Sequence, residues 1–354
     1  MTPKELVYTQ IAHRETPYIP YTLSFDDGAG VDARLDAHYG SPAWREALTQ
    51  HIFAMKAIDD GLSWDLITEA PFSTDKYGSV WRTDVWQRYL VEPALKAPTL
   101  DGYDWPDTSV FFPPAFCAKV RKALEDNRNA FTAVGFNFGL FERAWTLRGF
   151  ENVMADSVAE PAFFQQLIER IAQQQMEILE ELVTLPVDGI FFSDDWGGQR
   201  GLLLRPEVWR ATIKEPIGRM YAFAHSAGKV TLHHSCGNVA ALIPDLIEVG
   251  LDVLESVQPE AMNPCDLKQR FGDRLAFWGG LGSQSTIPFG TPNDIRAEVG
   301  RLCQVMGQGG GYILSPAKPL QADTPTENAV AIIEAFLEQA GAPPPLVSTS
   351  NPLN

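Results

Sequence analysis

Short apolar runs alternate with longer amphipathic segments along most of the chain, and this alternation predicts strands separated by helices. Helical spacing is clearest over residues 160–185, where Phe163, Leu167, Ile171 and Ile178 recur four or seven residues apart. A second amphipathic segment, 205–227, begins near Pro206, a residue type favoured in the first turn of a helix. The predicted strands are the runs 18–25, 64–69, 131–136, 188–193, 229–234, 252–257, 275–280 and 311–315.

Eight parallel strands joined by helices make a (β/α)8 TIM barrel, which is an α/β fold. We therefore predict a single-domain barrel over residues 1–341, with an insertion after the second strand. The insertion is expected because residues 72–115 do not alternate cleanly, and residues 75–82 have the pattern of a hairpin with a glycine turn. Residues 342–354 are polar and rich in proline, which predicts a flexible C-terminal tail.

Composition narrows the choice of partners and location. The chain has 354 residues, and 45% of them are hydrophobic, which is enough to bury a large core. Its 28 basic and 45 acidic residues give a formal charge of −17, which would repel both nucleic acid and an anionic membrane surface. We therefore expect a small-molecule substrate, with no nucleic acid and no membrane as partner. The four scattered cysteines and the polar N-terminal residues favour a cytoplasmic location.

The fifth apolar run ends in a His-x-Cys pair, His234 and Cys236, followed by Gly237. Side chains of an extended chain alternate between faces, so His234 and Cys236 point the same way. Imidazole nitrogen and thiolate sulfur are ligands that zinc prefers, and a catalytic zinc site uses three protein ligands with a fourth position open. We predict that both residues bind a metal, Zn2+. The alternative is a buried cysteine beside a histidine that makes ordinary hydrogen bonds.

Residues that follow the strands of a TIM barrel gather at one end, where the active site lies. The catalytic candidates at these positions are Asp194, Asp195, His234 and Lys318. The substrate-binding candidates are Trp196, Gln199, Asn238, Gln258 and Gln321. Structural alternatives exist for each group. Paired aspartates at the end of a strand often cap the next helix or bind an arginine, for which Arg200 and Arg205 are close in sequence, and amides often bind loop backbone. Trp196 would line a pocket only if it is not buried under a helix.

Several of these segments resemble the uroporphyrinogen decarboxylase superfamily, which contains tetrapyrrole decarboxylases and corrinoid-linked methyltransferases. The resemblance extends over residues 18–336, and it rests mainly on 189–195, 234–238, 278–280 and 324–328. It implies a (β/α)8 barrel with its active site at the strand ends.

The superfamily divides by chemistry. Its true decarboxylases work without a metal or organic cofactor and carry an Arg-Gln-Ala-Gly-Arg segment that binds substrate carboxylates. This chain instead has Asp26 and Asp27 near its first predicted strand, and these would repel a polycarboxylated porphyrinogen. Its methyltransferases bind zinc through a His-x-Cys pair and a later cysteine. The resemblance therefore implies a zinc-assisted methyltransferase that moves a methyl group between a small molecule and a thiol or corrinoid acceptor, with a corrinoid protein as a candidate partner.

Two other functions stay open. One is a cofactor-free decarboxylase of a tetrapyrrole, such as uroporphyrinogen, or of a related carboxylate. The other is a non-catalytic barrel that binds a small molecule or a corrinoid. Both keep the fold that the resemblance implies but dispense with zinc chemistry.

The third zinc ligand is also open. Where the methyltransferases have their later cysteine, this chain has Lys318, and a protonated ammonium has no lone pair for a metal. Asp194, Asp195 or Glu255 offers an oxygen instead, and Cys265 offers a more distant thiolate. Alternatively, the metal is lost and Lys318 holds a substrate carboxylate or phosphate. In a third alternative, Lys318 faces solvent and has no role in catalysis.

Overall fold

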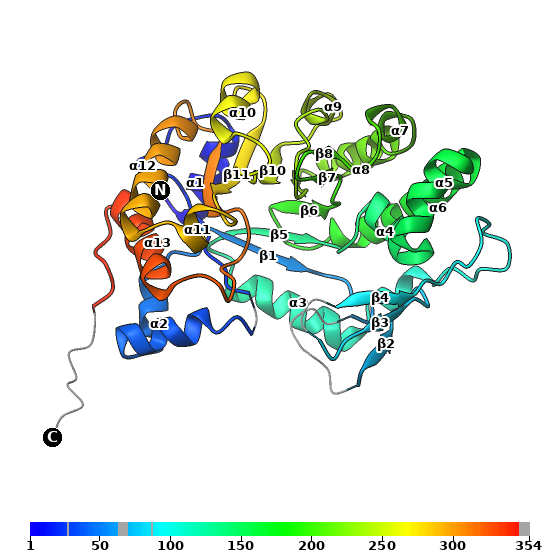
Figure 1. Cartoon of the computed structure of the whole chain (residues 1–354), viewed down its shortest axis with the longest axis horizontal. Coiled ribbons are helices and arrows are strands. Elements are labelled where there is room, and N and C mark those ends of the chain that lie inside the picture. The colour runs from blue at the N-terminus through cyan, green and yellow to red at the C-terminus, as the bar shows by residue number, and fades with distance from the viewer. Residues whose placement is uncertain (27, 63–69, 86–87, 347–354) are drawn as a thin grey trace.

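The computed structural model describes residues 1–26, 28–62, 70–85 and 88–346, and its central feature is a parallel sheet of seven strands (Figure 1). Every neighbouring pair in this sheet is parallel, so the fold is α/β with a TIM-like barrel. In spatial order the strands are β1 (Ile52–Lys56), β5 (Phe131–Gly135), β6 (Gly189–Ser193), β9 (Val230–His234), β10 (Val253–Ser256), β11 (Ala276–Leu281) and β12 (Tyr312–Pro316).

Six of the predicted strands are confirmed with small shifts of their ends: β5, β6, β9, β10, β11 and β12. The predicted strand 64–69 lies outside the described residues. The sequence pattern missed β1, because this run of five residues contains only one β-branched residue, Ile52, and ends at Lys56. The predicted strand 18–25 forms isolated parallel bridges instead of a strand: Tyr21 pairs with Leu314 of β12, and Phe25 pairs with Leu320 in the loop after β12.

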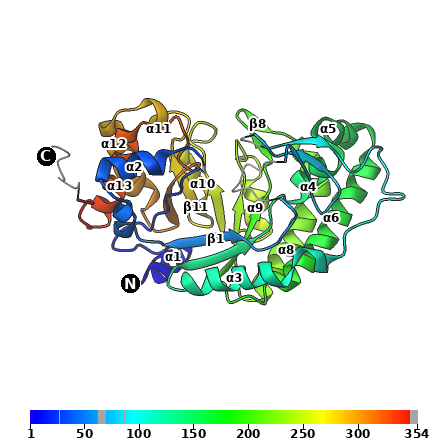
Figure 2. The same cartoon turned by 90° about the horizontal axis from the view of Figure 1, so that it is seen from below.

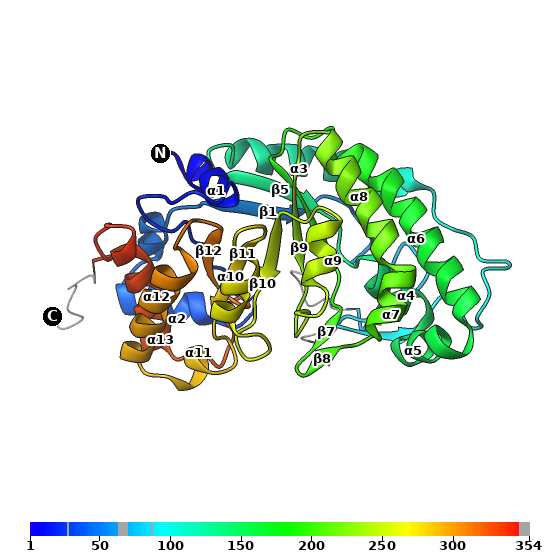
Figure 3. The same ribbon diagram turned by 90° about the horizontal axis from the view of Figure 1, so that it is seen from above.

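The helices surround the sheet, with α2, α12 and α13 on the opposite side of the strands from α4, α5 and α6 (Figures 1 and 2). Helices α6 and α8 contact each other along their length (Figure 3). The helices are α1 (Pro3–Ile11), α2 (Val31–Tyr39), α3 (Pro114–Asp126), α4 (Leu140–Arg148), α5 (Phe150–Ala159), α6 (Pro161–Leu182), α7 (Pro206–Thr212), α8 (Lys214–Ser226), α9 (Ile243–Glu248), α10 (Pro264–Phe271), α11 (Thr286–Phe289), α12 (Pro292–Met306) and α13 (Thr326–Gln339), with 3-10 turns η1 (Pro42–Ala47) and η2 (Thr108–Phe111).

The two amphipathic segments form helices, but the second one is divided. Residues 160–185 give α6, and 205–227 give α7 and α8 with a break at Ile213. Pro216 has no N–H to donate to the carbonyl of Thr212, which explains why one continuous helix does not form. Across the described part of the chain, no helix combines the length and the apolar character needed to cross a membrane.

A small antiparallel sheet follows β1 in the chain, at the place where the hairpin was predicted. Its strands are β2 (Phe72–Thr74), β3 (Val80–Arg82) and β4 (Tyr89–Glu92). The turn between β2 and β3 is closed by the buried carboxylate of Asp75. It accepts hydrogen bonds from the backbone N–H groups of Tyr77 (3.0 Å) and Ser79 (2.9 Å) and from the Trp81 indole (2.9 Å).

The inner face of the main sheet is packed with apolar side chains. Leu232, Val253, Ala276 and Ile313 are completely buried there, and Val7 of α1 packs against the same cluster. Because strand side chains alternate, the residues two positions beyond Leu232 and Val253 face the same interior. These residues are His234 and Glu255. The buried apolar layer therefore packs directly beneath His234 and Glu255 in the barrel interior, two positions back along each strand.

One seam of the barrel has no strand ladder. The segment 18–25 is bound to the β12 side, where the N–H of Thr22 donates to the carbonyl of Leu314 at 2.9 Å. Toward β1, the buried ring of His51 fills the gap: its Nδ1 lies 3.1 Å from the carbonyl oxygen of Tyr21, and its Nε2 lies 3.2 Å from the Tyr18 hydroxyl. Among the residues that the structure describes, no ladder joins β1 to this segment.

The seam makes stability sensitive to acid. Burial lowers the pKa of His51 from 6.5 to about 4, so between these values the unfolded chain binds a proton that the folded protein does not. Folding stability should therefore fall as the pH drops from 6.5 to 4, by about 3 kcal/mol from this group. Urea unfolding measured across this range should show a shallower decline for His51→Gln. An identical decline in both proteins would contradict the assignment.

Candidate metal centre and active-site cleft

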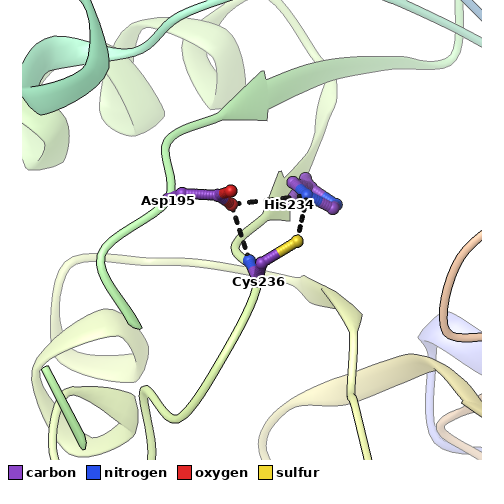
Figure 4. Close-up of side chains that lie close together, drawn as sticks. All are labelled: Asp195, His234 and Cys236. Atoms are coloured by element: carbon purple, nitrogen blue, oxygen red, sulfur yellow. Dashed lines mark hydrogen bonds and ion pairs between the residues drawn. The ribbon is translucent and has the colours of Figure 1, made fainter. Parts of the chain in front are cut away.

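Asp195, His234 and Cys236 meet at the ends of two adjacent strands (Figure 4). His234 is the last residue of β9, and Ser193, its partner in register, is the last residue of β6. Asp195 follows Ser193 closely, so its carboxylate reaches the same place. Nε2 of His234 lies 3.2 Å from Sγ of Cys236 and 3.4 Å from Oδ1 of Asp195. The three candidate ligand atoms lie within 4.8 Å of one another.

Glu255 fixes the orientation of the His234 ring. It pairs in register with His234 across β9 and β10, and its carboxylate is hydrogen-bonded to Nδ1 of His234. Nε2 is therefore the nitrogen that faces Cys236 and Asp195. A carboxylate on the far nitrogen of a histidine is the usual support for a metal-binding imidazole. From the sequence, Glu255 was predicted only as a possible oxygen ligand of the metal. Its hydrogen bond to His234 follows from the pairing of β9 with β10, which the sequence pattern does not give.

The charges of this cluster depend on one another. Burial alone would lower the pKa of His234, but the Glu255 charge and the hydrogen bonds of Asp195 and Cys236 raise it well above its usual value. Burial would raise the pKa of Asp195, whereas His234, the Cys236 N–H and the Lys318 charge together lower it to about 2. A proton on His234 therefore offsets the neighbouring carboxylates, and a bound cation would take over that role.

A further carboxyl group, Glu142 of α4, lies near this cluster and was not predicted. Burial and the charges of Asp195 and Asp194 raise the pKa of Glu142 well above its ordinary value. Its position at the start of a helix is set by tertiary packing rather than by strand order. No pattern in the local sequence indicates it.

Asp194 points away from the cluster and caps α4. Its carboxylate accepts hydrogen bonds from the backbone N–H groups of Phe141 (2.9 Å) and Glu142 (2.7 Å) and from the indole of Trp196 (2.8 Å). Burial raises the pKa of Asp194 to about 7 against the effect of these donors. Asp194 therefore caps a helix, but the earlier helix α4 rather than the next one, and its catalytic role stays a prediction.

Trp196 is buried rather than displayed to a ligand, with 2% of its surface exposed. Its ring stacks on His233 with a centroid distance of 4.3 Å and meets Trp209 of α7 edge to face. His233 in turn contacts the Tyr221 hydroxyl of α8 at 2.6 Å. Trp196 lies under α7 and α8 and does not line the cleft. The structure therefore gives no support to the predicted contact of Trp196 with substrate.

The predicted amide residues are mostly engaged with other loops. Gln258 accepts from the N–H of Gly237 at 3.3 Å and donates to Gln199 at 2.9 Å. Gln199 donates to Gln284 at 2.9 Å, and Asn238 donates to the carbonyl of Ala261 at 3.0 Å. Gln321 lines a separate hollow of about 250 Å³. These contacts favour a structural role for Asn238 and a loop-bracing role for Gln258 and Gln199.

A cleft of about 910 Å³ lies along the barrel seam and includes the cluster. Asp195, His234, Cys236, Glu255 and Lys318 all line it. Its aromatic walls, which the sequence did not predict as site residues, come from Tyr21, Phe25, Trp44, Phe53, Phe191 and Trp278. The cleft thus joins the candidate metal ligands to an apolar surface that can bind a small organic molecule.

The structure narrows the choice of a third ligand to Asp195. Asp194 is occupied by α4, and Glu255 by Nδ1 of His234. Cys265 lies elsewhere and accepts from the Arg301 guanidinium at 3.0 Å. Within the described ranges, Asp195, His234 and Cys236 are the group whose donor atoms come together. We refer to these three residues as the triad.

Residues 92–339 match the family model for uroporphyrinogen decarboxylase (URO-D), which covers more than half of the chain. The chain belongs to the uroporphyrinogen decarboxylase family. It is 26% identical over 185 residues to a methylcobamide:CoM methyltransferase, MtaA, of Methanosarcina barkeri, an alignment that spans 52% of each chain. It is 24% identical over 238 residues to a uroporphyrinogen decarboxylase of Aliivibrio salmonicida, spanning 62% of each. The alignments thus cover only part of either relative's length.

A solved structure extends the comparison to the whole fold. The methyltransferase from Methanosarcina mazei matches 96% of this chain and 99% of its own, with a TM-score of 0.72 and 18% sequence identity. At that identity the match shows the shared fold alone. The two relatives aligned with this uroporphyrinogen decarboxylase family member, a methyltransferase and a decarboxylase, catalyse different reactions.

In this family member the loop 235–238, which carries Cys236, is packed tightly against the hairpin of β7 (Gly197–Gly198) and β8 (Gly201–Leu202). The N–H of Asn238 donates to the carbonyl of Gly198 at 2.8 Å. Gly237 has a φ of +73°, and a Cβ there would lie 2.4 Å from the carbonyl oxygen of Gly197. Only glycine at position 237 allows the two backbones to approach this closely.

We expect Gly237→Ala to destabilise the protein by roughly 3 kcal/mol or more, because it adds a backbone clash to left-handed strain. Gly309→Ala is a matched control, since Gly309 has a φ of +70° with nothing within 4 Å of its Cβ position. It should cost roughly 1 kcal/mol. Chemical denaturation followed by circular dichroism compares the two. Equal losses would show that the contact with Gly197 does not constrain the loop.

Proposed function

We propose that this protein is a zinc-assisted methyltransferase that moves a methyl group between a small molecule and a thiol or corrinoid acceptor. The observation that carries the proposal is the triad, whose nitrogen, sulfur and oxygen donors lie within 4.8 Å at the wall of an aromatic cleft. Three such ligands with a fourth position left open are typical of catalytic zinc. The similarity to a methylcobamide:CoM methyltransferase supports a corrinoid as one of the two groups between which the methyl group moves.

The chain's own residues would divide the work. Nε2 of His234, Sγ of Cys236 and Oδ1 of Asp195 would hold the metal, while Glu255 keeps the His234 ring in the required tautomer by accepting from Nδ1. Bound zinc supplies Lewis acidity, which lowers the pKa of a coordinated thiol toward neutrality. The aromatic walls of the cleft would exclude water from the reacting groups.

We also propose that residues 1–341 form one (β/α)8 domain. In this arrangement the segment 18–25 occupies the eighth strand position between β12 and β1, and the sheet of β2, β3 and β4 is an insertion. The bridges of Tyr21 and Phe25 to the last strand and its loop support this arrangement. Residues 342–354 would then be a tail outside the barrel.

A second candidate is decarboxylation of a tetrapyrrole or related carboxylate without a metal. The uroporphyrinogen decarboxylase alignment, which covers 62% of the chain, favours it. Asp195, held ionised with a pKa of about 2, would then act as a fixed negative charge in the cleft. Turnover of a porphyrinogen by chelator-treated protein would select this candidate. A barrel that binds a small molecule or corrinoid without catalysis would instead show binding and no turnover.

Metal analysis tests the methyltransferase directly. Protein purified without chelator should contain about one zinc per chain, and Asp195→Ala, His234→Ala and Cys236→Ala should each lose most of it, because every substitution removes one of three ligands. Cys265→Ala should retain zinc, since its thiol lies outside the triad. Full metal content in the three triad variants would rule out this site.

The support given by Glu255 can be measured as metal affinity. Glu255→Ala should weaken zinc binding about 10- to 100-fold, and Glu255→Gln should weaken it less, because an amide oxygen can still accept from Nδ1. Competition against a chromogenic chelator gives these affinities without an activity assay. Glu248→Gln, a change on the exposed side of α9, serves as the control. Unchanged affinity in Glu255→Ala would contradict the supporting role.

A further inference from the structure

Lys318 is exposed to solvent, as one of the sequence alternatives expected, and it also lines the cleft from a loop whose backbone is hydrogen-bonded on both sides. It follows β12 and lines the same cleft as the triad. On one side, the N–H of Ala317 donates to the carbonyl of Leu281 at 2.9 Å. On the other, the N–H of Leu320 donates to the carbonyl of Ser24 at 2.9 Å. Because both neighbouring segments are hydrogen-bonded to strands or the segment 18–25, the Lys318 backbone is held in place over the cleft.

Lys318 also differs from the other strong cation in the cleft wall. The guanidinium of Arg45 is bound to Asp36, lies 3.6 Å from Asp32 and stacks on the Trp44 ring at 4.5 Å. No hydrogen bond or ion pair of the Lys318 ammonium is found among the described residues. Lys318 lines the same cleft as Asp195, His234 and Cys236. A cation without such a partner therefore lies in the wall of the cleft that contains the triad.

The surroundings would otherwise repel an anion. The chain carries a formal charge of −17, and the carboxylates of Asp195 and Glu255 line the same cleft. A local positive charge in the cleft wall would favour the approach of a negatively charged ligand to the triad. Lys318 is the unpaired ammonium at this place, and its flexible stem lets three donors turn toward an oxyanion.

We propose that Lys318 binds an oxyanion group of the small-molecule substrate while the triad acts on the opposite end of the same molecule. This inference rests on the proposed function in taking the triad as the reaction centre. It makes Lys318 a specificity-determining residue, which admits substrates with a carboxylate, sulfonate or phosphate and discriminates against neutral analogues of the same size.

Alkylation of Cys236 tests this charge preference without a known substrate. Iodoacetate and iodoacetamide have similar size and the same leaving group but differ in charge. In chelator-treated protein, Lys318→Gln should slow the reaction of Cys236 with iodoacetate about fivefold, as expected for a partly screened charge, and change the iodoacetamide rate less than twofold. Lys318→Arg should retain the iodoacetate rate. Peptide mass spectrometry follows each cysteine separately.

Two controls isolate the position of the charge. Lys119→Gln removes an exposed lysine on α3, outside the cleft wall, and should leave both rates at Cys236 unchanged. Cys265, which is bound by Arg301 elsewhere, should keep its own preference in Lys318→Gln. The proposal is overturned if Lys318→Gln changes both reagents equally, or if Lys119→Gln has the same effect as Lys318→Gln.

Competition identifies the oxyanion. At constant ionic strength, acetate, methanesulfonate or inorganic phosphate should protect Cys236 from iodoacetate in the wild type but not in Lys318→Gln. The strongest protector reports the group that the site prefers, and protection by none of them overturns the proposal. Because the protein is metal-free, the result is separable from zinc binding. If the protein contains zinc but Cys236 shows no preference for the charged reagent, only the inference about Lys318 is contradicted. If Cys236 shows the preference but the protein contains no zinc, only the proposed methyltransferase is contradicted.

Discussion

The buried carboxylate of Asp194 connects the segments that surround the candidate site. It accepts three hydrogen bonds, two from the N-terminus of α4 and one from Trp196, and a buried carboxyl group is destabilising without such partners. The helix N-terminus also favours negative charge. Through these bonds the end of β6, the start of α4 and the Trp196 ring against His233 become one unit. Asp195 follows directly in the chain, so the position of the triad carboxylate depends on its buried neighbour.

Parallel register then assembles the rest of the centre. Strands β6, β9 and β10 lie side by side, and their pairing brings Ser193, His234 and Glu255 to the same level. The imidazole is held between two carboxylates: Glu255 fixes one nitrogen, and Asp195 lies beside the other together with Cys236. Glu255 contacts Nδ1, whereas Asp195 and Cys236 both contact Nε2, so the hydrogen bond to Glu255 also determines which nitrogen faces the other two residues. The loop that carries Cys236 is fixed in turn by the Asn238 hydrogen bond to Gly198.

Much of this arrangement follows from alternation along the sequence. Six strands, the long helix α6 and the shared direction of His234 and Cys236 were predicted because they depend on periodicity within a few residues. Other features depend on distant contacts. Asp194 caps a helix more than fifty residues earlier, Glu142 gains its environment from that same helix start, and His51 fills a seam beside Tyr18 and Tyr21. The strand β1 is too short for its pattern to stand out, and the break before α8 follows from the single proline Pro216.

At the barrel seam, where the strand ladder is incomplete, the cleft wall and the triad come from different parts of the chain. Most of the wall comes from the segment 18–25, η1 and β1, in the first sixth of the chain, whereas the triad and Glu255 come from the ends of β6, β9 and β10. Leu23, Phe25 and Phe53 of these wall segments are only partly buried, so they can be exchanged at less cost to the core than the buried Tyr21 and Trp44. Ligand choice and reaction chemistry can therefore diverge independently, and redesign of the seam offers a way to change what enters without rebuilding what reacts.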